Sequence, residues 1–267
     1  MKPLSDQTFD AVARLFHSVS GIRLTEAKHA LVTGRLQRLA AEAGEADVDT
    51  YVDKLLHGGA PAQEMTKLID RLTTNETYFF REPQHFNDLA DRLAGVPPGQ
   101  AFSVWSAASS SGEEAYSVAM LLSEQLTHAP WQIIGTDLST AMVASARRGL
   151  YPMDRARLVP PAYLKRFCLK GMGEQTGQVL VSRELRSKVR FEPANLMQPL
   201  PDWLPTFDVV FLRNVLIYFD ADAKIEILRR VLGHLKPQGV LYTGHAESLS
   251  SLGLPLRALG TAVYTHA

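Results

Sequence analysis

The sequence has little cysteine and no excess of either charge, and each lack excludes a class of protein. Cys168 is the only cysteine among 267 residues, so neither an intrachain disulfide nor a cysteine-based metal cluster can form. The 28 basic and 28 acidic side chains cancel, which leaves no global field to hold a nucleic acid, only room for a local patch. The sequence therefore predicts a protein of a reducing compartment with no nucleic-acid partner.

Long hydrophobic runs are also missing. The longest apolar stretch, residues 209–219, is interrupted by Arg213 and Asn214 and is too short to span a bilayer. The first residues, MKPLSDQTFDAVARLF, lack the apolar core of a signal peptide. We therefore expect a cytoplasmic protein without direct membrane insertion.

Helical patterns dominate the first part of the chain. Apolar residues recur at spacings of three and four, as in Phe9, Val12 and Phe16, and strand patterns are scarce. This predicts a helical N-terminal domain over residues 1–80. A linker helix is expected over residues 81–99, where Pro97 and Pro98 mark its end.

The pattern changes after residue 100, where short apolar runs alternate with helical stretches. The alternation predicts parallel strands with crossover helices, hence an α/β domain with a Rossmann-like doubly wound sheet over residues 100–267. A glycine-rich interval predicts a helical turn and a small hairpin inserted in this domain. The expected strands are 102–105, 132–135, 189–192, 207–212 and 239–242, with an edge hairpin at 256–258 and 262–266.

Residues 102–137 have the order of a nucleoside-binding βαβ unit. An apolar strand opens into a small-residue turn at 107–112, and a helix and a second strand follow, ending in Asp137. Such an acid accepts hydrogen bonds from ribose hydroxyls and normally follows the turn by roughly 20 residues. The alternatives are a tight turn without a ligand and an aspartate that caps the next helix. The turn and the acid together favour the nucleoside site.

The turn lacks the G-x-G-x-x-G fingerprint of phosphate-binding units. It leads into Glu113 and Glu114, and two carboxylates at a helix N-terminus would repel a pyrophosphate. They suit a ligand with a ribose and positive charge but no phosphate, such as S-adenosylmethionine (SAM) with its sulfonium and ammonium groups. Neighbouring helical residues point in different directions, so one glutamate is expected to face the ligand, and the spacing does not say which.

Polar residues also follow two other predicted strands. Asn195 comes after the strand at 189–192 and offers an amide that matches an adenine edge, although an ordinary asparagine turn fits the spacing better. Arg213 and Asn214 stand where the strand at 207–212 should emerge, and Tyr218 follows. The Asn/Asp-Pro-Pro-aromatic motif of DNA adenine methyltransferases is absent at this place, which disfavours methylation of nucleic acid.

Two further features have competing interpretations. Residues 72–81 combine polar residues, three aromatics and Arg81, which fits either a cover over a bound ligand or a packed connector between domains. His245 could bind a metal or act as a base, but no partner stands at metal-site spacing in the sequence. A structural histidine is therefore the favoured interpretation.

Taken together, these segments resemble the chemotaxis receptor methyltransferases, the CheR-type protein-glutamate O-methyltransferases. The resemblance runs from Leu72 to the C-terminus, and residues 1–71 match only in helical character. It implies methyl transfer from SAM to glutamate carboxylates of chemoreceptors, with S-adenosylhomocysteine as the other product and without a metal. It also identifies the glycine-rich insertion as a small antiparallel β-subdomain at about residues 160–190. The matching segments are LTTNETYFFRE, VWSAASSSGEEAYS, GTDLS, FEPANL, FDVVFLRNVLIYFD, LKPQGVLYTGHAE and AVY.

The resemblance also assigns site residues, and it selects Glu114 over Glu113. From the chemistry of methyl transfer we take Arg81 and Tyr218 as the candidate catalytic residues. We expect Arg81 to orient a carboxylate of SAM or substrate, and Tyr218 to line the point of methyl transfer. The implied SAM contacts are Asn75, Thr77, Arg81, Glu114, Asp137, Asn195, Leu196, Asn214 and Val215.

Partners follow from the same resemblance. We expect a monomer that acts on the cytoplasmic helical bundle of chemoreceptors, and in some family members the β-subdomain docks a receptor's C-terminal peptide. Lys28, Arg35 and Arg38 either steer acidic receptor helices or form a solvated face. Two other classes stay open: a SAM-binding regulator without catalysis, and a methyltransferase acting on a small molecule or nucleic acid.

Overall fold

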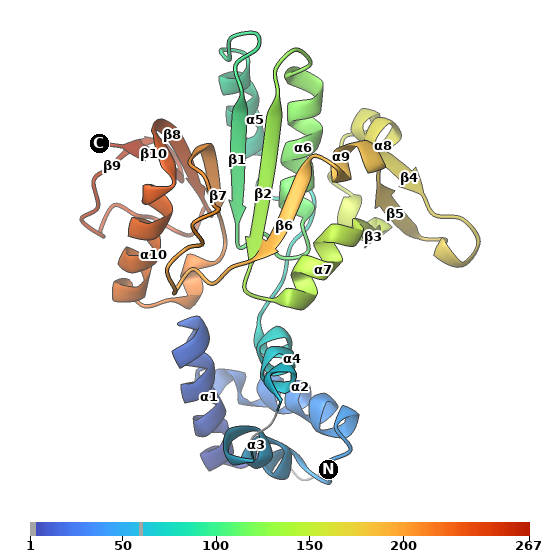
Figure 1. Ribbon diagram of the computed structural model, residues 1–267, viewed down its shortest axis with the longest axis vertical. Helices are drawn as coiled ribbons and strands as arrows, with labels where there is room; N and C mark the ends of the chain where they lie inside the picture. Colours follow the sequence, from blue (N-terminus) through green and yellow to red (C-terminus); the bar gives the residue numbers. More distant parts are fainter. Residues whose placement is uncertain (1–3, 59–60) are drawn as a thin grey trace. The chain divides into compact units, whose positions relative to one another are not determined.

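A computed structural model describes residues 4–58 and 61–267, which form two compact units (Figure 1). The first unit contains the described residues up to Thr74 together with Tyr218–Ala223. The second contains Asn75–Ile217 and Lys224–Ala267. Residues 1–3 and 59–60, which belong to the predicted N-terminal domain, lie outside the described residues.

The first unit is helical, as the apolar spacing predicts. Helix α1 begins after Ser5, whose Oγ accepts a hydrogen bond from the Thr8 amide at 3.3 Å, and it ends at Gly21 in the left-handed conformation. The buried faces of the helices form one apolar core that includes Val12, Leu36 and Leu68. The elements are α1 (Asp6–Ser20), η1 (Glu26–Lys28), α2 (His29–Glu42), α3 (Val48–His57) and α4 (Ala62–Leu72).

The second unit is built on a seven-stranded sheet with the order β6-β2-β1-β7-β8-β10-β9. The first five strands in this order pair in parallel, and β10 pairs antiparallel with both β8 and β9. The prediction of a doubly wound α/β sheet is confirmed. The strands are β1 (Phe102–Ala107), β2 (Trp131–Asp137), β6 (Val189–Pro193), β7 (Phe207–Leu212), β8 (Leu235–Thr243), β9 (Leu256–Gly260) and β10 (Val263–His266).

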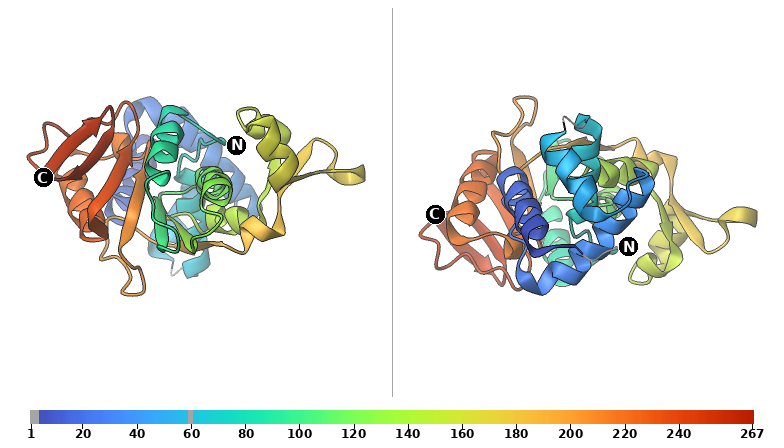
Figure 2. Two further views of the ribbon diagram at one scale, coloured as in Figure 1. Left: turned by 90° about the horizontal axis from the view of Figure 1, so that it is seen from above. Right: turned by 90° about the horizontal axis from the view of Figure 1, so that it is seen from below.

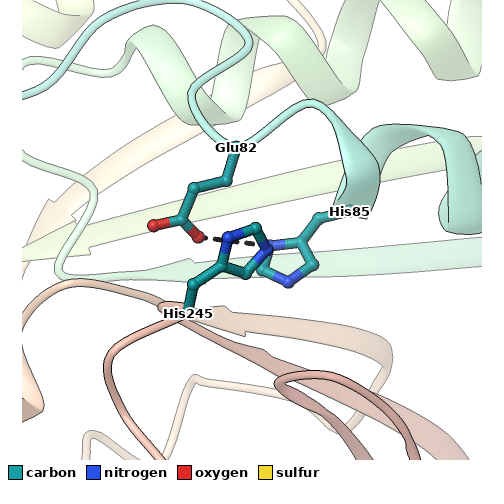
Figure 3. A group of neighbouring side chains, drawn as sticks. All are labelled: Glu82, His85 and His245. Carbon is teal, nitrogen blue, oxygen red and sulfur yellow. Dashed lines mark ion pairs between the residues drawn. The ribbon is translucent and has the colours of Figure 1, made fainter.

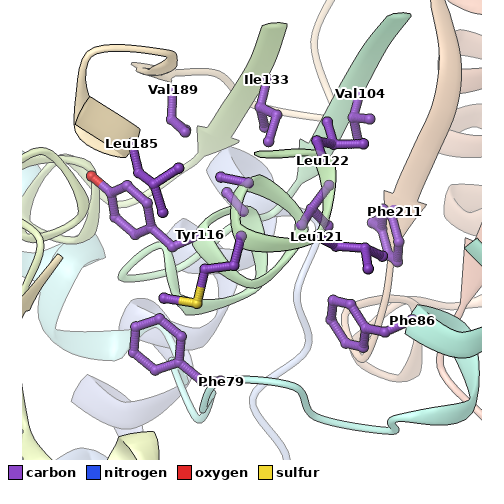
Figure 4. Packing of buried hydrophobic residues seen from close by; sticks show 14 of the residues in the cluster. Phe79, Phe86, Val104, Tyr116, Leu121, Leu122, Ile133, Leu185, Val189 and Phe211 are labelled. Atoms are coloured by element: carbon purple, nitrogen blue, oxygen red, sulfur yellow. The ribbon is translucent and has the colours of Figure 1, made fainter. Parts of the chain in front are cut away.

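Helices cover the parallel part of the sheet. Helix α6 packs on β1, β2 and β6, helix α7 packs on β2 and β6, and α5 packs on α6. Figure 4 shows Leu122 of α6 close to Val104 of β1 and Ile133 of β2, all buried. No helix within residues 4–58 and 61–267 combines the length and apolar character needed to cross a membrane. The helices are α5 (Gln84–Leu93), α6 (Glu113–Gln125), α7 (Thr140–Arg148) and α10 (Ala221–Gly233).

A separate three-stranded antiparallel sheet, with the order β3-β5-β4, interrupts the α/β order. It confirms the predicted inserted subdomain and projects from one side of the large sheet (Figure 2). Its first strand was not expected, because β3 is only three residues long and ends in Pro152, which gives no strand pattern. The elements are β3 (Leu150–Pro152), η2 (Met153–Ala156), α8 (Pro161–Phe167), β4 (Cys168–Lys170), η3 (Gly173–Gln175), β5 (Gln178–Val181) and α9 (Arg183–Arg186).

Candidate active site

The turn after β1 is tight and strained. Ala108, Ser110 and Gly112 all have positive φ angles, of 58°, 49° and 96°. A Cβ at Gly112 would lie 2.8 Å from the Ala146 Cβ and 3.0 Å from the Phe191 ring, so only glycine fits there. Non-glycine residues in this conformation persist where their surroundings fix them, commonly at functional sites.

Asp137 fixes this turn from the end of β2. Its Oδ2 accepts the Ser110 amide at 2.7 Å and its Oδ1 accepts the Ser139 amide at 2.8 Å. Helix α7 is capped by Ser139, whose Oγ accepts the Met142 amide at 3.2 Å, so Asp137 is not the helix cap. The Asp137 carboxylate therefore holds the turn after β1 and the start of the loop before α7 together.

Two other predicted site residues adjoin the same turn. The Ser110 Oγ lies 3.4 Å from the Asn75 carbonyl, and the Ala194 amide donates to the Asp137 carbonyl at 2.9 Å, which places Asn195 next in the loop. The Asn195 Oδ1 accepts the Met197 amide at 2.9 Å. That bond is the ordinary asparagine turn that the spacing favoured, and it fixes the orientation of the amide.

The two glutamates that open α6 point to different partners. Glu113 is fully buried, and its Oε1 accepts from Arg155 at 2.6 Å while its Oε2 accepts the Ser111 hydroxyl at 2.7 Å. Tyr151 adds a hydrogen bond from its hydroxyl to the Ser111 carbonyl at 2.7 Å. Glu113 therefore ties the turn to the first elements of the small sheet.

Glu114 faces the strand ends instead. Its carboxylate accepts the Ser106 hydroxyl at 2.7 Å and the Arg213 guanidinium at 2.9 Å. Burial raises the pKa of Glu114, and the neighbouring Arg213 and Ser106 oppose that rise. The different partners explain why sequence spacing alone could not separate Glu113 from Glu114.

Arg213 joins the site's separate segments. It follows β7 directly, its side chain is only 2% exposed, and besides Glu114 it pairs with Glu82 at 3.0 Å and donates to the Arg81 carbonyl. The side-chain amide of Asn214 donates to the other Glu82 oxygen at 3.0 Å. Burial acts to raise the pKa of Glu82, but the bonds from Asn214 and Arg213 outweigh it, and the pKa lies below its ordinary value.

Glu247 supports the loop after β7. Its Oε2 accepts hydrogen bonds from the backbone amides of Asn214 at 2.7 Å and Gly244 at 2.6 Å. Its Oε1 accepts from the backbone amide of Ile217 at 3.2 Å. Asn214 has a φ of 57°, a left-handed conformation that asparagine tolerates. Sequence reasoning missed Glu82 and Glu247. An arginine beside a buried strand was the available signal, because such a charge needs acidic partners.

The remaining predicted residues divide between the two units. Arg81 donates to the Glu76 carbonyl at 2.8 Å, and its guanidinium lies 5.7 Å from the centre of the Tyr78 ring. Thr77 lies between Glu76 and Tyr78 in the same segment. Val215 directly follows Asn214, and the buried Leu196 directly follows Asn195. Tyr218 belongs to the helical unit, where Lys28 Nζ lies 5.2 Å from its ring centre.

His245 has neighbours that the sequence did not indicate. His85 and Glu82 lie beside it, with the His85 Nδ1 at 3.6 Å from a Glu82 oxygen (Figure 3). Burial, reinforced by the Arg213 charge, lowers the pKa of His85 to about 4. The imidazole of His85 is therefore neutral near pH 7.

The polar groups of the site fit SAM better than a phosphate ligand. Asp137 and Glu114 place two carboxylates beside the turn, where they would repel a phosphate. The Ser109 hydroxyl is buried in the turn and has no hydrogen-bond partner among the described residues, so it is available to a ligand. The site therefore offers acceptors and small residues at the carboxyl ends of parallel strands, where such sheets bind ligands.

We expect Arg155→Met to loosen this turn, because the substitution leaves the buried Glu113 carboxylate without its cation. The free energy of unfolding should fall by about 1–3 kcal/mol, and SAM binding should weaken. Thermal denaturation and calorimetric titration with SAM measure the two effects. Arg157→Met is the matched control, since Arg157 is exposed and, among the described residues, donates only to the Asp154 carbonyl, at 2.9 Å. Equal effects of the two substitutions would contradict the role of Arg155.

Comparison with known proteins covers both units. Residues 75–264 match the family model described as the CheR methyltransferase, SAM binding domain, and residues 7–73 match the CheR methyltransferase, all-alpha domain. The chain is 39% identical to a chemotaxis protein methyltransferase of Escherichia coli K12, over 98% of this chain and 91% of that protein. It is 35% identical to chemotaxis protein methyltransferase 2 of Pseudomonas aeruginosa, over 98% and 93%. A glycopeptide N-methyltransferase complexed with sinefungin has a TM-score of 0.40 at 18% identity, covering 72% of this chain and 59% of that one.

Proposed function

Because the chain belongs to the CheR methyltransferase family, we propose that it methylates glutamate side chains of chemotaxis receptors with SAM as the methyl donor. The observation that carries the proposal is the similarity to chemotaxis protein methyltransferases over nearly the whole chain. The cofactor is SAM, and the product of the proposed transfer is a glutamate methyl ester together with S-adenosylhomocysteine.

The chemistry requires little proton transfer. A glutamate with an ordinary pKa of about 4.3 is ionised at pH 7, so its carboxylate attacks without a general base. SAM, when bound, supplies an activated methyl group whose leaving group departs neutral. The protein's contribution is then alignment of the carboxylate with the methyl group and partial exclusion of water.

The site's segments suggest how the chain holds SAM. Asp137 accepts the ribose hydroxyls while it keeps the turn closed, and Glu114, fixed by Arg213, faces the positive charge. Asn195 and Leu196 lie at the adenine end, and Asn214 and Val215 line the exit of β7. Asn75, Thr77 and Arg81 cover the ligand from the extended segment before α5.

Arg81 and Tyr218 complete the proposal on the substrate side. Arg81 orients a carboxylate through paired hydrogen bonds, and too tight a pairing would weaken the attacking oxygens, so its role is positional. Tyr218, which directly follows Ile217 in the chain, is the residue proposed to line the point of methyl transfer. Its ring contact with Lys28 belongs to the helical unit.

We expect Arg81→Ala to lower the turnover of methyl transfer by about a hundredfold, because a misplaced carboxylate loses alignment. Arg81→Lys keeps the positive charge but lacks the planar guanidinium, so its turnover should lie between those of the unmodified protein and Arg81→Ala. Steady-state rates and calorimetric SAM affinity are measured for both variants. Full turnover and unchanged SAM affinity in Arg81→Ala would refute the assigned role.

The proposed partner is the cytoplasmic helical bundle of chemoreceptors, and we propose that the protein acts on it in the cytoplasm as a monomer. The three-stranded subdomain is where a receptor's C-terminal peptide would dock, since it projects from the sheet (Figure 2). Of the basic residues, Arg35 already donates to the Leu72 and Thr73 carbonyls at 2.8 and 3.2 Å. Lys28 and Arg38 remain as the candidates to steer acidic receptor helices.

The experiment offers methyl-labelled SAM and the protein to receptor-containing membranes. Label on the receptor supports the proposal, and an Asp137→Ala variant, expected to bind SAM much more weakly, serves as the control. SAM binding without transferred label would identify a regulator instead. Label recovered only on small molecules or nucleic acid would identify a different methyltransferase.

A further inference from the structure

Glu82, His85 and His245 form a compact group of metal-ligating side chains. Each offers one ligand atom, and these atoms lie within 4.8 Å of one another. The two imidazole rings have centroids 4.8 Å apart at an interplanar angle of 73°. The three side chains converge from two separate parts of the chain, the start of α5 and the turn after β8 (Figure 3).

His85 provides independent evidence for a missing partner. The residue is 1% exposed, and neither ring nitrogen meets the distance and angle of a hydrogen bond with a partner among the described residues, although a backbone interaction with Thr261 acts to raise its pKa. A buried imidazole of this kind costs folding free energy unless a partner satisfies it. Its Nδ1 lies only 3.6 Å from a Glu82 oxygen, so a bound ion would satisfy both groups at once.

Glu82 is held as metal-binding carboxylates commonly are. Asn214 donates to one of its oxygens and Arg213 to the other, each at 3.0 Å, and each oxygen keeps a lone pair for an ion. The Arg213 charge opposes a cation, but Glu82 and Glu114 together outweigh it by one negative charge. His245 is exposed, which leaves a path for the ion and a coordination position for water.

We propose that Glu82, His85 and His245 bind one divalent transition-metal ion of the Zn²⁺ class, with water in the fourth position. Two imidazoles and a carboxylate suit Zn²⁺ and Co²⁺, with bonds of about 2.0–2.2 Å. Tetrahedral binding requires the ligand atoms, which lie within 4.8 Å of one another, to move closer, and His245 is the exposed member of the group. The proposed methyl transfer needs no metal, so the ion acts structurally and clamps the start of α5 to the turn after β8.

The test titrates Co²⁺ into the chelator-treated 267-residue chain and follows the visible absorption of tetrahedral cobalt. We expect saturation at one equivalent and displacement by Zn²⁺. His245→Ala should weaken binding by at least about tenfold. His57→Ala is the control, since that histidine is exposed on α3 beside Asp53 and should leave the titration unchanged.

A second readout does not depend on the cobalt spectrum. Zn²⁺ should raise the melting temperature of the unmodified chain and leave that of His245→Ala unchanged. No tetrahedral spectrum in the unmodified chain, or the same spectrum in His245→Ala, would overturn the site, because other histidines would then hold the ion. These results are independent of methyl transfer, so they do not bear on the proposed function.

Discussion

Replacing Arg213 with methionine should lower the free energy of unfolding of the sheet-containing unit by about 3–5 kcal/mol. The side chain is 2% exposed and pairs with Glu82 and Glu114, so its loss leaves two carboxylates close together without a cation. Methionine has a similar volume, which keeps the cavity contribution small. Urea denaturation followed by tryptophan fluorescence reports this unit, because Trp105, Trp131 and Trp203 all lie in it.

The control for this substitution is Arg166→Met. Arg166 forms an ion pair with Glu124, its side chain is 52% exposed, and its loss should cost no more than about 1 kcal/mol. Adding Glu114→Gln to Arg213→Met should recover part of the lost stability, because it removes one of the unpaired charges. A loss of less than about 1 kcal/mol in Arg213→Met would contradict the account of this network.

Asp137→Ala should weaken SAM binding by about a hundredfold or more. Hydrogen bonds to a charged group contribute about 1.5–3 kcal/mol each, and the carboxylate is expected to accept bonds from the ribose while it fixes the Ser110 amide at 2.7 Å. Isothermal titration calorimetry with SAM measures the change. Asp91→Ala, an exposed position on α5, is the matched control and should bind SAM normally. Normal affinity in Asp137→Ala would show that the ligand binds elsewhere.

Local patterns were sufficient to predict the elements that carry the site. The strand, turn, helix and strand from 102 to 137 lie close together in the sequence, so periodicity and the acid at the strand end predict the βαβ unit without other information. The helical patterns before residue 80 were equally local. The strand β3 escaped prediction, because three residues ending in Pro152 have no period to read.

Pairings between distant segments were beyond sequence reasoning. Nothing in the sequence links Glu113 to Arg155, and only the fold shows that this pair leaves Glu114 to face the strand ends. The neighbours of His245 could not be predicted for the same reason. Glu82 and His85 come before the first strand of the sheet, whereas His245 follows β8. Which side chains meet across more than a hundred residues depends on the topology of the sheet, and the spacing of residues in the sequence does not give that topology.

The chemical stability of the transferred methyl group tests the central claim most directly. Receptor-containing membranes are labelled with methyl-labelled SAM and this protein, and the washed receptor is then exposed to mild base. A glutamate methyl ester hydrolyses under these conditions, so the account predicts that the label is released as methanol. Methylamines survive the same treatment, and label that stays on the receptor would contradict methyl transfer to a carboxylate.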